Sequence, residues 1–167
     1  RAAKGLSPLA TPVRVLRDAL REAGIDASPV CDVTEVAQPR WQPAIESYLG
    51  MNAQALVISR EAEEDAIDIA RRLGGRARGA KLVLPSRVHP WRGTAPGLLA
   101  GELIKGDDLD AVNFIRQTLG QLACVDTVAE LRASKAAIME DGTLSKGMTI
   151  EPLGVPERLV IGRQGDD

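Results

Sequence analysis

The chain has 167 residues, of which 44% are hydrophobic and 26% charged, and its net charge is −2. This is the composition of an ordinary soluble globule, long enough for one domain, or two small lobes sharing a core, to fold without disulfides. No apolar run reaches the length of a membrane span and no signal-peptide pattern is visible, so we expect neither a membrane partner nor export.

Periodicity and end signals predict a mixed α/β (α+β) fold with short sheets and flanking helices. In chain order we expect a connector (1–11), a helix (12–23), a strand (29–36), a helix (41–49), a strand (55–59), a helix (61–73), a strand (81–84), a loop (85–97), a helix from Asp107 or Asp108, a strand (122–126), a short helix from Thr127, a hairpin at Asp141-Gly142 between 136–139 and 143–150, and a strand (158–161).

The helix over 61–73 has the clearest end signals. Ser59 is its expected N-cap, acidic residues occupy its first turn, and arginines its last turn, which complements the helix dipole. Two cysteines, Cys31 and Cys124, each lie in an apolar run. This position favours buried, reduced thiols and a cytoplasmic location.

One pattern occurs twice, seventy positions apart. The first copy reads Ala44-Ile-Glu-Ser-Tyr-Leu-Gly50 and continues into the apolar run 55–59; the second reads Phe114-Ile-Arg-Gln-Thr-Leu-Gly120 and continues into 122–126. In each copy an amphipathic helix ends at Leu-Gly, a strand follows, and a further helix begins. A duplicated unit provides two related faces, which suits self-association better than a single catalytic cleft.

The residue pattern supports no catalytic, metal or cofactor site. The single histidine, His89, lies in a loop without a sequence context that pairs it with a nucleophile, and the glycine-rich run 74–79 follows a helix and lacks the Gly-Lys-Ser/Thr of a phosphate loop. An enzyme whose site forms in the loop 85–97 remains an alternative.

Positive charge is concentrated in one stretch. Between Asp68 and Glu102 there is no acidic residue, so this stretch carries +7 and the remainder of the chain −9. Its basic residues are Arg71, Arg72, Arg76, Arg78, Lys81, Arg87 and Arg92. They either form a solvated surface or contact the phosphates of DNA without reading bases, with Trp91 available to stack on an unpaired base.

The hairpin is the candidate for self-association. A strand over 144–148 with glycine inside it allows another backbone to approach closely, and an exposed edge can pair with a second chain. The expected contact residues are Gly142, Leu144, Ser145, Lys146, Gly147 and Met148. The alternative is an ordinary hairpin covered within its own chain.

Two regions of the sequence resemble the hinge domain of the SMC family, the ring-forming ATPases of chromosome organisation. The region 30–50, followed by the apolar run 55–59, is similar to the family's opening strand and "W-x-x-A-I-E-x-x-L-G" helix. Ile138-Met-Glu-Asp-Gly-Thr-Leu-Ser-Lys-Gly147 resembles its late "T-x-D-G-x-x-x-x-x-G" hairpin. Within the family the chain looks most like the condensin-like MksB and Wadjet JetC proteins.

The resemblance implies a non-enzymatic, two-lobed homodimerisation domain at the tip of an antiparallel coiled coil, in a nucleoid-associated protein of chromosome segregation or plasmid defence. It places a coiled-coil connector at 1–11, the hinge at 12–163 (lobe one 12–84, linking loop 85–106, lobe two 107–163) and the exit at 164–167. The ATPase heads, kleisin and other subunits would lie or bind elsewhere on the parent. SMC hinges often touch DNA, here through the basic stretch; a stand-alone DNA-binding module is the alternative. Only two glycines, Gly142 and Gly147, replace the usual glycine run, which leaves a one-sided dimer open.

Overall fold

The computed structural model describes residues 9–162, so most of the expected connector and the exit at 164–167 lie outside the described residues. Short 3₁₀ helices (η) alternate with longer helices and strands. The elements are α1 (Thr11–Glu22), β1 (Ser28–Pro29), η1 (Val30–Asp32), β2 (Glu35–Val36), η2 (Pro39–Trp41), α2 (Gln42–Leu49), η3 (Gly50–Gln54), β3 (Leu56–Val57), η4 (Arg60–Ala62), α3 (Glu63–Leu73), η5 (Gly74–Ala77), β4 (Leu82–Val83), η6 (Pro85–Arg87), η7 (Ala100–Leu103), β5 (Ile104–Lys105), α4 (Leu109–Leu119), β6 (Ala123–Cys124), α5 (Val128–Ala133), β7 (Ala136–Ile138), β8 (Thr143–Lys146) and β9 (Thr149–Pro152).

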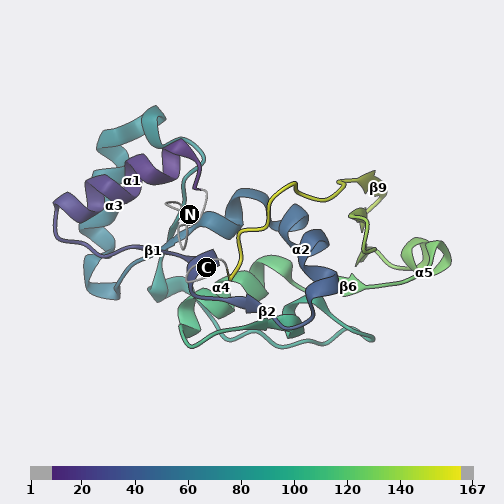
Figure 1. Ribbon diagram of the computed structural model, residues 1–167. Coiled ribbons are helices and arrows are strands. Elements are labelled where there is room, and N and C mark those ends of the chain that lie inside the picture. The colour runs from purple at the N-terminus through teal and green to yellow at the C-terminus, as the bar shows by residue number, and fades with distance from the viewer. Residues whose placement is uncertain (1–8, 163–167) are drawn as a thin grey trace.

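Two units with the same order of elements follow each other along the chain, which confirms the pseudo-repeat. In each unit a helix leads to a strand, and a second helix then leads to a parallel neighbouring strand. This order is α2–β3–α3–β4 in the first unit and α4–β6–α5–β7 in the second. Figure 1 shows α1 and α3 at one end of the molecule and α5 and β9 at the other.

The equivalence of the units begins earlier in the chain than the sequence pattern indicates. Val30 N donates to Ala55 O at 2.8 Å, and seventy positions later Ala100 N donates to Leu122 O at 2.8 Å. Each of these turns is followed by a two-residue strand, and the two strands, β2 and β5, pair with each other antiparallel. The stretch 98–105, assigned from sequence to the linking loop, thus holds the opening elements of the second unit.

Three helices end in the same backbone conformation, at a glycine that follows Ile-x-x-x-Leu. Gly50, Gly74 and Gly120 have φ of 53°, 56° and 60° and ψ of −131°, −130° and −132°. A residue with a side chain adopts positive φ at a cost, so glycine at these ends is required by the backbone. The repeated sequence pattern contains this ending at Gly50 and Gly120, and the end of α3 at Gly74 is a third copy.

One hydrophobic core runs through the described residues, and α2 and α4 pack against each other within it. In the last turn before its glycine, each of these helices buries an isoleucine and, four residues later, a leucine. The deeply buried residues are Ile45, Leu49, Ile115 and Leu119, with Trp41 beside them at 2% exposure. α1 covers the far end and buries Val13, Leu16 and Leu20.

The strands form three separate sheets. Their orders are β1-β3-β4, β2-β5 and β6-β7-β8-β9. The hairpin at Asp141-Gly142 is confirmed, with Ile138 opposite Leu144. The expected single run 143–150, however, is divided by a second turn at Gly147-Met148 into β8 and β9.

Three local expectations were wrong. The alternating stretch 29–36 is not one strand, because a 3₁₀ turn over Val30–Asp32 separates β1 from β2. The apolar stretch 158–161 pairs with no strand; the carboxylate of Glu46 accepts its backbone N–H groups instead. The side chain of Ser59 caps no N–H group at the start of η4. The helices expected over 12–23, 41–49 and 61–73 are present, each within two residues of its expected ends or extended by a 3₁₀ turn.

Candidate interaction surfaces

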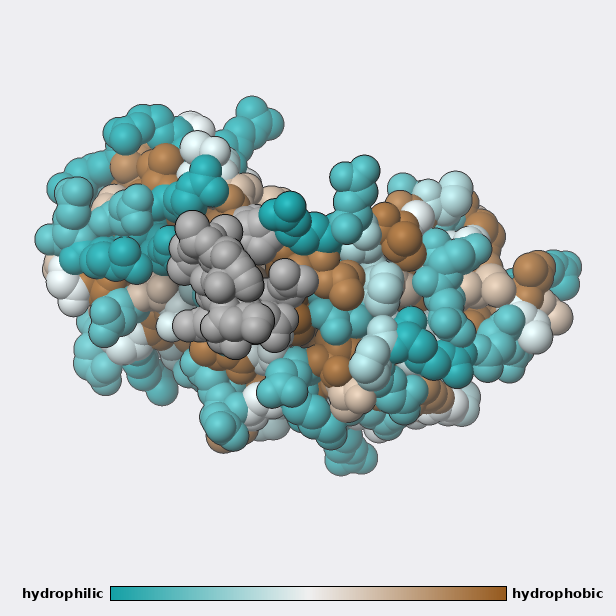
Figure 2. Space-filling view, viewed as in Figure 1, coloured by the Kyte–Doolittle hydropathy of each residue, from teal (hydrophilic) through white to brown (hydrophobic). Residues whose placement is uncertain are grey.

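The four-stranded sheet has one fully exposed edge strand, β9. It is the last strand in the order β6-β7-β8-β9, and each of its four residues is exposed. Ile150 is 54% exposed on this strand, and Met148, in the preceding turn, is 101% exposed. Figure 2 shows apolar side chains among hydrophilic ones at this end of the molecule.

The expectation that 144–148 forms an exposed edge is therefore corrected. β8 lies between β7 and β9, and its residues Leu144 and Ser145 are buried at 6% and 4% exposure. Ser145 Oγ donates to the carbonyl of Ser134 at 2.5 Å. Of the six expected contact residues, Lys146, Gly147 and Met148 are exposed, and Leu144, Ser145 and Gly142 are covered by their own chain. Contact of any of them with a second chain remains a prediction.

The two hairpin glycines have different roles. Gly142 (φ +87°) lies against the backbone of Gly154, and a Cβ at this position would overlap the Gly154 carbonyl. Gly147 (φ +58°) is the first residue of the two-residue turn between β8 and β9 and has open space around it. The close backbone approach expected at this hairpin thus occurs at Gly142, and within the same chain.

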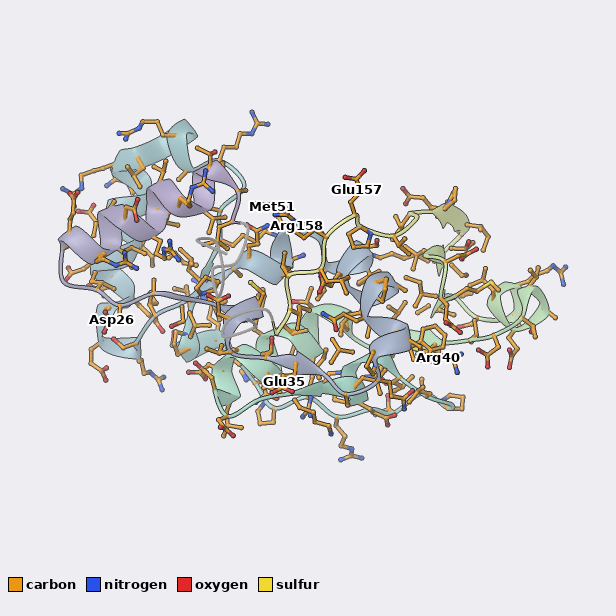
Figure 3. All side chains as sticks on the ribbon, viewed as in Figure 1. Asp26, Glu35, Arg40, Met51, Glu157 and Arg158 are labelled. Atoms are coloured by element: carbon orange, nitrogen blue, oxygen red, sulfur yellow. The ribbon has the colours of Figure 1, made fainter. Side chains whose placement is uncertain are left out.

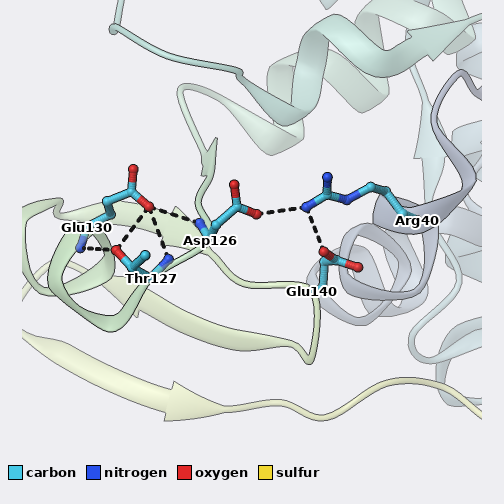
Figure 4. Close-up of polar contacts among 5 residues, drawn as sticks. All are labelled: Arg40, Asp126, Thr127, Glu130 and Glu140. Atoms are coloured by element: carbon cyan, nitrogen blue, oxygen red, sulfur yellow. Dashed lines mark hydrogen bonds and ion pairs between the residues drawn. The ribbon is translucent and has the colours of Figure 1, made fainter.

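An ion-pair network connects the four-stranded sheet to the first unit (Figure 4). Arg40, in η2, donates from a single Nη2 atom to Asp126 at 2.7 Å and to Glu140 at 2.6 Å. Its guanidinium also lies 4.8 Å from the ring centroid of Trp41. Desolvation lowers the pKa of Arg40, but the charges and hydrogen bonds of Glu140 and Asp126 outweigh it and raise the pKa overall.

The two carboxylates of this network are held by ordered turns. Asp126 precedes the capping box of α5, in which Thr127 and Glu130 bond each other's backbone N–H groups. The hydrogen bond from the Asp126 N–H, with those from Thr127, lowers the pKa of Glu130. Glu140 precedes Asp141, whose carboxylate accepts from the Thr143 hydroxyl and N–H, which lowers the pKa of Asp141.

The basic stretch is divided between two supports. Its seven basic residues are exposed. The first four belong to α3, η5 and the residue after η5, which pack against α1. Arg92 lies in the loop 85–97, where its carbonyl accepts from Gln121 Nε2 at 3.0 Å beside the end of α4. The stretch is continuous in sequence, but its two ends are held by different helices.

Some of these cations already have partners. Arg71 and Arg72 pair with Asp68 at 3.1 and 3.6 Å, and Lys81 Nζ donates to Asn52 Oδ1 at 2.6 Å. The two arginine–aspartate pairs are exposed, so they exchange readily with a competing anion.

Trp91 is not a free stacking surface. Its indole Nε1 donates to the carbonyl of Gly120 at 3.0 Å, and its ring lies so close to Gly101 that a Cβ there would be 2.7 Å from it. Trp91 is half-buried, and stacking of its ring on an unpaired base stays a prediction. Trp91 covers the glycine turn at the end of α4, a contact that sequence offers no signal to find.

The described residues show neither the histidine site considered from sequence nor a metal cluster. His89 is exposed, and two cavities, of about 950 and 400 Å³, are lined by other residues. Within residues 9–162 no three His, Cys, Asp or Glu side chains gather in a way that could hold a metal ion. Neither cysteine forms a disulfide; Cys31 is buried, and desolvation raises the pKa of the Cys124 thiol to about 12. None of the helices in this range has the length and apolarity to cross a bilayer.

Comparison with known proteins places the fold. No protein-family model and no curated protein matches the sequence. The chain is similar to the Pyrococcus furiosus Smc hinge domain with an extended coiled coil (TM-score 0.67, 21% identity), over 84% of this chain and 55% of that one. It thus spans about half of that structure.

Two further hinge structures are similar over most of this chain. The Pyrococcus furiosus SMC protein hinge domain has a TM-score of 0.64 and 22% identity, covering 92% of this chain and 96% of that one. The asymmetric dimer of the Geobacillus stearothermophilus SMC hinge domain has a TM-score of 0.69 and 19% identity, covering 96% and 71%. The duplicated units, the short sheets and these likenesses together identify the fold of the chain as that of SMC hinge domains.

Proposed function

We propose that this domain is the dimerisation hinge of an SMC-like protein and that two copies join through the free edge formed by β9. The observation that carries the proposal is the exposed outer edge of β9, which pairs on its other side with β8, in a fold shared with SMC hinges. One similar hinge, from Geobacillus stearothermophilus, is described as an asymmetric dimer. In this proposal the domain acts by binding a second copy of itself and has no catalytic role.

The chemistry of the edge fits a second strand as its occupant. An edge strand presents unpaired N–H and C=O groups, which a second chain satisfies by adding a strand, while apolar side chains at the edge add burial. Ile150 and Met148 supply apolar surface at this edge. Pro152 has no N–H group and limits the pairing to the part of β9 that precedes it.

The test is the mass of the 167-residue chain in solution, measured by sedimentation velocity over a range of concentrations. Ile150→Lys places a charge on the edge and is expected to shift the wild-type dimer to the monomer. The matched control is Val155→Lys, since Val155 is 53% exposed, nearly the same as Ile150, but lies beyond β9. The control is expected to remain dimeric.

Two results would contradict the proposal at different levels. A wild-type chain that is monomeric at high micromolar concentration overturns the dimerisation function. A dimer that both lysine variants retain leaves dimerisation standing and removes β9 from the interface. Leu144→Asp is not a clean test, because Leu144 is buried at 6% exposure and a charge there unfolds its own chain.

A second candidate function is non-specific DNA binding by the basic stretch. The exposure of all seven cations supports it, in particular that of Arg76, Arg78 and Arg87. Contacts of this kind are made to phosphates and weaken steeply as salt rises. Trp91 is half-buried and bonded through its Nε1 to the Gly120 carbonyl, so the proposed binding relies mainly on phosphate contacts.

A triple charge reversal tests the DNA proposal. Arg76, Arg78 and Arg87 are each changed to Glu, and binding to a duplex and to a single strand is followed by fluorescence anisotropy at several salt concentrations. Loss of binding and a shallower salt dependence are expected. Unchanged binding in the triple variant would remove this surface from the function.

The parent protein that we propose is a condensin-like SMC ATPase of the MksB or Wadjet JetC type. It would act at the nucleoid in chromosome segregation or plasmid defence, with kleisin and other subunits bound elsewhere. The late hairpin at 138–147 and the "W-x-x-A-I-E-x-x-L-G" helix support this choice. Sequencing the regions that flank the chain tests it: long heptad repeats on both sides are expected, and their absence would contradict it.

A further inference from the structure

The segment 40–54, which comprises Arg40, Trp41, α2 and η3, contacts three parts of the molecule that are distant from it in sequence. These are the beginning of the described chain, its end, and the four-stranded sheet. Figure 3 labels Arg40 and Met51 towards the two ends of this segment, and Arg158 on the C-terminal stretch. The yellow C-terminal stretch of Figure 1 runs beside α2.

The C-terminal contact is a buried carboxylate. Glu46 is 6% exposed, and its two oxygens accept from the backbone N–H groups of Val160 at 2.8 Å and Ile161 at 2.9 Å. Gln42, one turn earlier on α2, donates from Nε2 both to Glu46 at 2.8 Å and to the Ile161 carbonyl at 2.8 Å. A buried charge that is bound in this way holds its partners firmly, because release would leave it unpaired.

The N-terminal contact lies at the other end of the segment. The Ala10 N–H, just before α1, donates to Gln54 Oε1 at 2.7 Å. Leu9 is 5% exposed within the core. Both ends of the described chain are therefore hydrogen-bonded to side chains of the segment 40–54.

The sheet is attached to the same segment by two cations. Arg40 binds Asp126 and Glu140, at the ends of β6 and β7. Lys146, on β8, places its Nζ 5.3 Å from the ring centroid of Tyr48 on α2. The Arg40 side chain is 50% exposed, so dissolved salt weakens its ion pairs with Asp126 and Glu140. The hydrogen bonds of the buried Glu46 are shielded from salt.

The pseudo-repeat offers an internal comparison. The position in the second unit that corresponds to Glu46 is Arg116, since each follows the isoleucine of Ile-x-x-x-Leu-Gly. Arg116 donates to the Ile104 carbonyl at 2.7 Å, a contact within its own unit. The carboxylate that holds the end of the chain is thus a feature of the first unit alone, and the two units are not interchangeable.

We propose that the segment 40–54 is a coupling element that links the position of the chain ends to the four-stranded sheet and its β9 edge. A shift of residues 160–161 moves α2 through Glu46, and α2 moves the sheet through Arg40 and Tyr48. The meaning of this link for partner binding rests on the proposed dimerisation function. The link itself is a property of the single chain.

Hydrogen exchange of the 167-residue chain, read by mass spectrometry, tests the coupling. Glu46→Gln keeps the shape of the side chain but replaces one acceptor oxygen with a donor that faces a backbone N–H. Exchange at residues 159–162 is expected to rise roughly tenfold, the effect of losing one charged hydrogen bond. Exchange in β7–β9 is expected to rise at least about twofold. Glu157→Gln, which removes the same charge from the exposed face of the C-terminal stretch, is expected to change neither.

The reverse experiment starts from the exposed end, where a variant folds readily. Arg40→Gln releases Asp126 and Glu140, and because coupling is reciprocal it is expected to speed exchange at residues 159–162 as well as in β7–β9. If Glu46→Gln does not fold, this variant decides the question alone. Faster exchange confined to the end that was altered, in either variant, overturns the coupling.

The same samples separate this inference from the proposed function. If the wild-type chain is monomeric but the two regions respond together, the coupling stands and the dimer does not. If the chain is dimeric and the regions respond independently, the dimer stands and the coupling does not. If both stand, Glu46→Gln is expected to weaken the dimer, whereas Glu157→Gln leaves it unchanged.

Discussion

At the scale of single residues, the two hairpin glycines have different energetic roles. Gly142 has φ of +87° and lies against the Gly154 backbone, whereas Gly147 has φ of +58° and no neighbour within 4 Å of a Cβ. A side chain at Gly147 therefore meets only the conformational cost of positive φ. A side chain at Gly142 has the same conformational cost. It also clashes with the backbone of Gly154, which cannot move aside by changing a rotamer as a side chain can.

Alanine substitutions at these glycines are expected to separate the two costs. Gly147→Ala should lower the free energy of unfolding by about 1 kcal/mol, the cost of the left-handed region. Gly142→Ala should lower it by about 3 kcal/mol or more, because overpacking is added. Urea denaturation followed by circular dichroism measures both, and equal losses would contradict the assigned contact with Gly154.

The thiol of Cys124 is expected to be almost unreactive in the folded chain. Desolvation raises its pKa from 9.0 to about 12, so little thiolate is present at pH 8. Alkylation of Cys124 at pH 8, quantified by peptide mass spectrometry, should be about a thousandfold slower in the folded chain than in urea. Since the folded pKa is the higher one, the thiol's contribution to stability is complete below pH 9 and declines as the pH rises from 9 towards 12. A rate in the folded chain close to that in urea would contradict this burial.

At the scale of elements, the beginning of α5 and the beginning of η4 make a matched pair. Both follow a hydroxyl residue, but only Thr127 accepts a backbone N–H, from Glu130 at 3.1 Å. Thr127→Ala is expected to lower the free energy of unfolding by about 1 kcal/mol. Ser59→Ala is expected to change it by less than about 0.5 kcal/mol. Urea titrations of the two variants check this contrast; a larger loss at Ser59 would contradict it.

The helices were predictable and most of the strands were not, for a physical reason. In a helix of 8–12 residues, apolar residues recur every three or four positions and so reveal the buried face. A Leu-Gly pair or a capping residue marks its ends. Most strands here have two residues, too few for an alternation to appear. The stretch 158–161 has the composition of a strand, but its N–H groups bond a side chain from 114 residues earlier.

The candidate edge illustrates the same limit. Asp141-Gly142 correctly located the hairpin, because the turn is a local property. Which strand of the sheet is outermost depends on how β8 and β9 pair, and Gly147-Met148 is a weaker turn signal than Asp-Gly. Leu144 was therefore placed at the surface although it packs into the core.

At the scale of the whole molecule, three carboxylates near the surface make the free energy of unfolding depend on pH in acid. Hydrogen bonds from the Ser86 hydroxyl and N–H lower the pKa of Glu63, and local hydrogen bonds likewise lower those of Glu130 and Asp141. A lowered pKa in the folded chain means that the stabilisation is present above the ordinary carboxyl pKa of about 4 and is lost as the pH falls through the folded values.

The expected result is a fall in the urea midpoint between pH 5 and pH 2, to which these groups contribute. Glu63→Gln should make that fall shallower, because Gln does not titrate, and Glu64→Gln serves as the exposed neighbour on the same helix turn. Urea titrations at unit steps of pH measure it. An equal slope in the Glu63 variant and wild type would contradict the role of the bonds to Ser86.

The bond between Glu46 and residues 160–161 also has a consequence for biosynthesis. Ribosomes add residues from the N-terminus at a limited rate, so α2 emerges long before the N–H groups that its carboxylate requires. Until then Glu46 keeps its water, and the core around Ile45 and Leu49 closes beside a hydrated charge. Residues 160–161, translated long after α2, thus complete the first unit, and a nascent chain truncated before residue 160 lacks the N–H groups that replace this water.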